Sequence, residues 1–136
     1  MNIDSIKNGI VIDHITAGRG MKIYQLLNLD ALDCSVAIIK NGSRNKMGKK
    51  DIIKIDADIE LNMDILGYVD PNVTINLIRD GKLVAKRRAT LPQKLTHVLF
   101  CKNPRCITTT EQEIQHIFAL SDKGDYRCIY CETPAN

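Results

Sequence analysis

The sequence has few aromatic residues: no tryptophan, two phenylalanines and four tyrosines among 136 residues. Proteins that bind single-stranded nucleic acid without sequence preference stack bases on exposed rings, so this scarcity argues against that class. No apolar run approaches the roughly 20 residues needed to cross a bilayer, and the N-terminus lacks the pattern of a secretion signal. With only eight glycines and four prolines, the composition is that of a globular protein, and we expect a cytoplasmic location.

Charge and cysteine are both distributed unevenly. The net charge of +3 is too small by itself to imply a polyanionic partner, but the basic residues gather in segments 40–54 and 79–88. Cys34 is the only cysteine of the first part, whereas the other four follow residue 100. Between them, Pro92 disfavours helix at the preceding residue and cannot donate a backbone hydrogen bond. The sequence therefore predicts two domains, 1–90 and 91–136.

The first domain combines strand and helix patterns. Apolar stripes predict short helices over residues 21–29 and 60–68, the second ending before Asp70-Pro71. Asp80-Gly81 is a strong hairpin signal. β-Branched and apolar runs predict strands over 9–15, 34–40, 50–55, 73–79 and 82–88. The order predicts an α+β fold of the ferredoxin-like type, an antiparallel sheet with two helices on one face.

The second domain carries a C-x4-C pair and a C-x2-C pair. These are Cys101 and Cys106, then Cys128 and Cys131. A hairpin between the two pairs would let four thiolates close a tetrahedron around one structural zinc ion. Disulfides and unliganded thiols are the alternatives. A reducing cytoplasm disfavours disulfides, and unliganded thiols would leave so small a domain without a stabilising cross-link. We predict a small all-β zinc-binding domain, and no catalytic metal, since four thiolates leave no position for water.

Several residues of the first domain could form a binding face. Lys50 and Lys54 share one face of their predicted strand. Strand alternation also places Asn76, Ile78 and Leu83 together, a polar amide beside apolar groups that could hold a flat heterocycle. Lys86 falls on the opposite parity and would join them only from a frayed end or a bulge.

The sequence shows no recognisable catalytic machinery. Adjacent positions on a strand predict that Asp13 and His14 point to opposite faces, so they should not form a dyad. Gly18-Arg19-Gly20 lacks the third glycine of a dinucleotide fingerprint, and there is no phosphate-binding P-loop. We therefore expect a protein that is not an enzyme.

The whole chain resembles the regulatory chain of aspartate carbamoyltransferase. The resemblance rests on Ile10-Val11-Ile12-Asp13-His14-Ile15, on Met47-Gly48-Lys49-Lys50-Asp51-Ile52-Ile53-Lys54-Ile55, on Asn76 and Lys86 around the hairpin, and on the cysteine quartet. It implies a nucleotide-effector domain followed by a zinc domain that docks on the catalytic chain. It further implies a regulatory homodimer, in an assembly of two catalytic trimers and three regulatory dimers, controlled by CTP, UTP or ATP in pyrimidine biosynthesis.

The resemblance also implies roles for individual residues. Asp13 and Lys54 would contact ribose or base, while His14 and Lys86 would hold the phosphates, with Lys50 near the triphosphate or a second nucleotide. The base would be surrounded by Ile3, Ile6, Asn76, Ile78 and Leu83. The family's hairpin commonly supplies a tyrosine where this chain has Gly81.

Two other functions stay open at this stage. A zinc-ribbon protein that binds nucleic acid could use segments 40–54 and 79–88 as a phosphate track, which predicts steeply salt-dependent binding. A zinc-dependent enzyme would need an open metal position. The resemblance instead implies neither nucleic acid nor membrane as a partner.

Overall fold

The computed structural model describes residues 6–40, 44–45 and 48–135. The chain divides into two compact units at the junction of Leu91 and Pro92, and each is described by itself. None of the helices in these described segments is long and apolar enough to cross a membrane.

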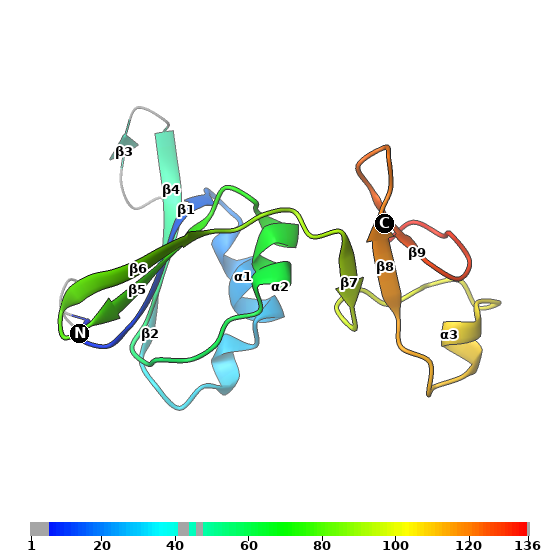
Figure 1. The fold of residues 1–136 in the computed structure, drawn as a ribbon, viewed down its shortest axis with the longest axis horizontal. Coiled ribbons are helices and arrows are strands. Elements are labelled where there is room, and N and C mark those ends of the chain that lie inside the picture. The colour runs from blue at the N-terminus through cyan, green and yellow to red at the C-terminus, as the bar shows by residue number, and fades with distance from the viewer. Residues whose placement is uncertain (1–5, 41–43, 46–47, 136) are drawn as a thin grey trace. The chain divides into compact units, whose positions relative to one another are not determined.

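The first unit is an antiparallel sheet with helices on one side (Figure 1). Its strands follow the order β2-β4-β1-β5-β6, and the short β3 pairs with β4 beside this path. The strands are β1 (Gly9–Thr16), β2 (Val36–Ile39), β3 (Arg44–Asn45), β4 (Gly48–Ile55), β5 (Thr74–Arg79) and β6 (Lys82–Arg88). The helices are α1 (Gly20–Leu26), the 3-10 turn η1 (Leu29–Ala31) and α2 (Met63–Val69). The predicted ferredoxin-like α+β arrangement is confirmed, with most element ends shifted by one to three residues.

The core of this unit lies between the sheet and the two helices. Isoleucines at alternate positions of β1 and β4 face the helices and are almost fully buried, as are Ile23 of α1 and Leu66 of α2. Branched side chains suit the pleated surface, and their burial supplies the main stabilisation of the layer. The opposite face of the sheet, named here the polar face, carries Val11, Asp13, Lys54, Asn76 and Lys86.

Two buried carboxylates hold the connection from β1 to α1. Asp51 accepts hydrogen bonds from the backbone N–H groups of Gly18 and Gly20, each at 3.0 Å. A Cβ on Gly20 would lie 2.9 Å from the Asp51 carboxylate, so this position requires glycine. Asp70, just after α2, accepts from the backbone N–H of Thr16 at 2.6 Å. These bonds satisfy loop donors that would otherwise be buried without a partner.

The second unit is a three-stranded antiparallel sheet of order β7-β8-β9. Its strands are β7 (Lys94–Thr96), β8 (Ile117–Leu120) and β9 (Tyr126–Cys128), and a single helical turn, α3, covers Ile107–Thr110. Leu95, Phe118 and Tyr126 form its small core, with the Tyr126 hydroxyl donating to the Pro92 carbonyl at 2.6 Å. The β8–β9 hairpin separates the two cysteine pairs along the chain, as the sequence predicts.

Candidate functional site

One row of side chains crosses the polar face of the first unit. Val11 of β1 lies opposite Lys54 of β4 on one side and opposite Asn76 of β5 on the other. Asn76 in turn lies opposite Lys86 of β6. Directly paired residues share a face, so the pairing brings two lysines and an amide into one line across four strands.

A β-bulge decides the place of Lys86. The pairing of β5 with β6 shifts between Leu77 and Ile78, which leaves Val84 as the extra residue of β6. Leu83 and Lys86 are three positions apart, so in a regular strand they would face opposite sides. The unpaired Val84 brings them to the same side. The bulge is one of the two routes that the sequence left open, and it places Leu83, opposite Ile78, on the same face as Lys86.

A second irregularity corrects the prediction for Asp13 and His14. The pairing of β1 with β4 shifts between Ile12 and Ile15, and His14 adopts a positive φ of 59°. The His14 ring nitrogen Nδ1 lies 2.9 Å from Oγ1 of Thr74, the residue paired with Asp13. The side chains of Asp13 and His14 therefore both lie on the polar face. The expectation of opposite faces was wrong because it assumed a regular strand without a bulge.

Asp13 is tied to Lys50 at this end of the polar face. Its carboxylate lies 2.9 Å from the Lys50 ammonium, and it also accepts from the backbone N–H of His14 at 2.7 Å. Burial acts to raise the pKa of Asp13, but the Lys50 ammonium and the His14 N–H outweigh it, so that the pKa lies below its usual value. Asp13 is thus a fixed anion that positions Lys50.

The other end of the face is apolar. Ile78 lies opposite both Gly9 and Leu83, and the Leu83 side chain is 56% exposed. A Cβ on Gly9 would lie 2.8 Å from Cγ2 of Ile6, so Ile6 packs closely at this strand end. Ile6 thus lies beside Gly9, the residue paired with Ile78, whereas the predicted Ile3 lies outside the described residues.

Asn76, at the centre of the face, has an unmet hydrogen-bonding requirement. Its side-chain oxygen Oδ1 is buried and has no hydrogen-bond partner among the described residues. Buried polar atoms are almost always paired, and an unpaired one at the centre of a face with flanking cations is typical of a place that a ligand completes.

The four cysteines of the second unit converge on one point. All their sulfurs lie within 4.8 Å of one another, with Cys101 and Cys131 Sγ 3.5 Å apart and Cys106 and Cys128 Sγ 3.7 Å apart. These separations exceed any disulfide bond, and the cysteines are free. Four bonds of about 2.3 Å in a tetrahedron give sulfur–sulfur edges of about 3.8 Å, so this donor set fits a zinc ion.

Two threonines support the sulfurs. Oγ1 of buried Thr108 lies 3.1 Å from Cys106 Sγ, and Oγ1 of Thr133 lies 3.2 Å from Cys131 Sγ. The Thr108 hydroxyl lowers the pKa of Cys106, and the Thr133 hydroxyl lowers the pKa of Cys131 to about 6. Burial raises the pKa values of Cys101 and Cys128. Hydroxyl groups placed in this way stabilise bound thiolates and orient them.

Sequence reasoning missed these threonines and two other supporting residues. A signal was present for the threonines, because each follows its cysteine by two positions. His116, whose Nδ1 accepts from the Cys101 backbone N–H at 2.9 Å, and Thr74 on the polar face had no such signal, since both depend on contacts distant in sequence. Arg127 of β9 forms an ion pair with Asp125 at 3.0 Å.

Known proteins share both units with this chain. Residues 1–90 match the family model described as aspartate carbamoyltransferase regulatory chain, allosteric domain, and residues 93–136 match the one described as its metal binding domain. The chain belongs to the family of aspartate carbamoyltransferase regulatory chains. The relative from Clostridium tetani is 50% identical over 97% of this chain and 94% of its own. Those from Clostridium acetobutylicum and Bifidobacterium longum are 46% and 41% identical, over 97% and 99% of this chain and 92% and 99% of theirs.

Family membership decides the class of the protein. A regulatory chain is a non-catalytic subunit, with an allosteric domain and a metal-binding domain, and it implies a catalytic chain as its partner. In the sequence, the residues that the resemblance assigns to a nucleotide fall within the matched range 1–90, and the cysteine quartet falls within 93–136. The expectation of a regulatory rather than an enzymatic role is confirmed by this membership.

Proposed function

We propose that the polar face of the first unit binds the nucleoside triphosphates CTP, UTP and ATP as effectors. The observation that supports the proposal is the row formed by Lys54 of β4, Asn76 of β5 and Lys86 of β6. The buried Asn76 Oδ1, which has no hydrogen-bond partner among the described residues, lies between the two lysines in this row. Lysines held on sheet positions can meet a triphosphate by charge-assisted hydrogen bonds without a glycine loop. The apolar end at Ile78 and Leu83 offers a surface for the base.

In this proposal each end of the face has its own task. His14 and Lys86 hold phosphates, Asp13 and Lys54 contact the ribose or the base, and Lys50 lies near the triphosphate or a second nucleotide. Asn76 Oδ1 is an acceptor only, so it would receive a donor such as an exocyclic amino group or a ribose hydroxyl. The base lies among Ile3, Ile6, Ile78 and Leu83.

The second unit, in the same proposal, holds one structural zinc ion and docks on the catalytic chain. Four exposed apolar residues adjoin the ligands in sequence, at 53%, 46%, 41% and 48% exposure: Phe100, Ile107, Ile129 and Tyr130. Apolar side chains held outward around a rigid metal centre are typical of a protein–protein contact. Two catalytic trimers and three regulatory dimers would form the cytoplasmic assembly.

Regulation then follows from differential affinity. An effector shifts the activity of the catalytic chain only as far as it binds one quaternary state better than the other, typically by about 1–3 kcal/mol of coupling. The alternative of a nucleic-acid-binding protein lacks a continuous track on β6. Lys86 and Arg88 pair with polar-face residues of β5, whereas Arg87 pairs with Ile75 of the buried side.

The proposal is tested by calorimetric titration of the chain with CTP and ATP. Lys86→Ala should weaken binding by about tenfold or more, because it removes a charge-assisted bond to phosphate. Lys82→Ala is the matched control, since Lys82 pairs with Arg79 on the reverse side of the same hairpin, and it should leave the affinity unchanged. Equal affinity in wild type and K86A would place the nucleotide elsewhere.

A second measurement addresses regulation. The chain is mixed with a catalytic aspartate carbamoyltransferase trimer, and carbamoyl aspartate formation is assayed with and without each nucleotide. We expect association and a nucleotide-dependent rate in the mixture only. Failure to associate at micromolar concentration would contradict the docking role of the zinc unit.

A further inference from the structure

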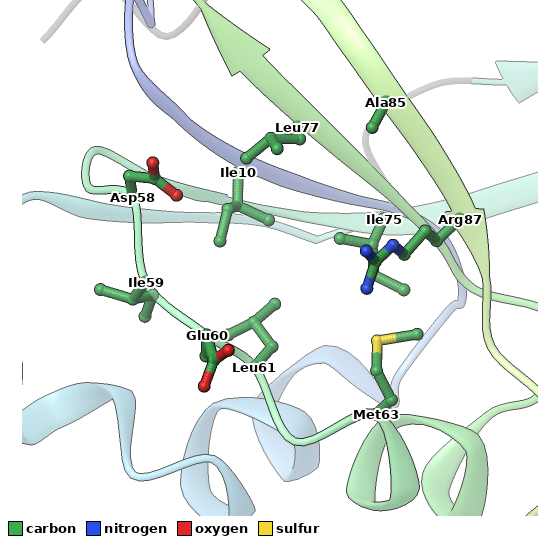
Figure 2. A pocket seen from close by; sticks show the side chains of 10 residues that line it. All are labelled: Ile10, Asp58, Ile59, Glu60, Leu61, Met63, Ile75, Leu77, Ala85 and Arg87. Atoms are coloured by element: carbon green, nitrogen blue, oxygen red, sulfur yellow. The ribbon is translucent and has the colours of Figure 1, made fainter.

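A cavity of about 390 Å³ lies on the helix side of the first unit, away from the polar face (Figure 2). It opens between the β5–β6 hairpin and the segment that leads from β4 to α2. Its lining combines apolar residues with three charged ones: Ile10, Asp58, Ile59, Glu60, Leu61, Met63, Ile75, Leu77, Ala85 and Arg87. Its volume is within the range of small-molecule sites.

The sequence of β6 explains why this space is open. Ala85 lies opposite Leu77, and Arg87 lies opposite Ile75, so the side of β6 that faces the helices offers a methyl group and a guanidinium in place of large apolar residues. Across the cavity, residues 57–61 form no backbone hydrogen bond with any described residue. An ion pair of Asp58 with Arg79 at 3.1 Å joins this segment to the hairpin.

One end of the cavity carries the Arg87 guanidinium, which favours an anionic ligand group at that end. Arg87 forms no hydrogen bond or ion pair with any described residue. Figure 2 shows its side chain reaching from β6 toward the cavity, whereas Asp58 and Glu60 lie on the opposite segment. Asp58 pairs with Arg79, and Glu60, the other carboxylate of the lining, forms no ion pair with Arg87. The available cation therefore borders an apolar surface made by Ile75, Leu77 and Met63.

We propose that this cavity is a second ligand site, which binds a small apolar carboxylate. The carboxylate pairs with the Arg87 guanidinium, whose planar fork matches its two oxygens, and the apolar body lies against Ile75, Leu77 and Met63. Because Asn76 and Lys86 alternate with these residues on the other face of the same strands, such a ligand does not compete for the polar face. The proposal is thus independent of nucleotide binding there.

Octanoate is the probe, with octylammonium as the matched cation of equal chain length. The full chain is labelled at isoleucine, leucine and alanine methyl groups, and each probe is titrated while methyl spectra are recorded. We expect octanoate to produce saturable shifts at Ile10, Ile75, Leu77 and Ala85 in the millimolar range. Octylammonium should bind at least fivefold more weakly, and saturating CTP should not displace octanoate.

Two variants separate shape from charge. Ala85→Leu fills the cavity and should weaken octanoate binding by more than tenfold, while its spectrum shows an intact fold. Arg87→Gln should weaken octanoate by about fivefold or more and remove the preference over octylammonium. Arg88→Gln is the control, because Arg88 pairs with Thr74 on the opposite face of the same strand, and it should change neither value.

Three outcomes would overturn the proposal. Shifts that do not saturate, or that spread over residues outside the cavity, indicate adsorption only. Equal binding of the ammonium and the carboxylate removes the role of Arg87. Unchanged octanoate affinity in R87Q also contradicts it, even where A85L fails to fold.

Discussion

At the scale of single residues, the polar face depends on a few fixed contacts. Asp13 holds Lys50 at 2.9 Å, and both side chains are largely shielded from solvent, with 20% and 17% exposure. Thr74 fixes the His14 ring, while Asn76 Oδ1 has no hydrogen-bond partner in the part of the chain that the structure describes. A face in which cations are positioned and one acceptor is unsatisfied is prepared for a ligand in a way that a solvated surface is not.

The Asp13–Lys50 pair predicts a specific pH dependence of stability. Because the folded-state pKa of Asp13 is lowered, the pair stabilises the fold above the unfolded value of about 4 and loses this effect as the pH falls through the folded value. Asp13→Asn should therefore reduce the free energy of unfolding by about 1 kcal/mol at pH 6. Urea unfolding at pH 6 and pH 3 measures the difference between wild type and D13N, which should shrink at pH 3. A difference that grows on acidification would contradict the assignment.

At the scale of elements, two bulges determine what the sheet can bind. The irregularity in β1 brings His14 to the side of Asp13, and Val84 in β6 brings Lys86 to the side of Leu83. The five longer strands and the two α-helices of the first unit, and the grouping of the cysteines, follow from periodicity and spacing, so the sequence predicts them. Bulges follow from how strands pair, which a single strand pattern does not contain, and this is why the parity of His14 and Lys86 could not be predicted.

The bulge at Val84 predicts an asymmetry between deletion and insertion. Deleting Val84 leaves a regular hairpin in which Lys86 still lies opposite Asn76, so CTP affinity should stay within about threefold of wild type. Inserting one alanine between Val84 and Ala85 lets Val84 and the new residue both pair with β5, so that the bulge disappears. Lys86 then lies opposite Thr74 instead of Asn76, two strand positions or about 7 Å away. Calorimetric titration should then show at least tenfold weaker binding, with circular dichroism confirming that both variants fold. Wild-type affinity in the insertion variant would show that the position of Lys86 does not matter.

At the scale of the whole molecule, the two units rely on different sources of stability. The first unit has a continuous apolar core between its sheet and helices. In the described part of the second unit, the buried large apolar residues are Leu95, Phe118 and Tyr126, beside three buried cysteines. A core this small requires a further constraint, and the cysteine quartet with its two threonines supplies the ligands for one.

This difference predicts that metal removal acts on one unit alone. Chelation of the bound ion, or Cys106→Ser, should unfold residues 92–136 and abolish association with the catalytic trimer, because ligation supplies most of the folding free energy of such a unit. Residues 1–91 should keep their amide spectrum and their CTP affinity, since the four cysteine ligands all belong to the other unit. Two-dimensional NMR and size-exclusion chromatography measure the two effects on the same sample.

Cys34→Ser is the matched control, as Cys34 packs against the core of the first unit, and it should leave assembly intact. Zinc added back to the chelated wild-type chain should restore assembly. A chelated chain that still assembles would show that the quartet does not hold the docking surface in place.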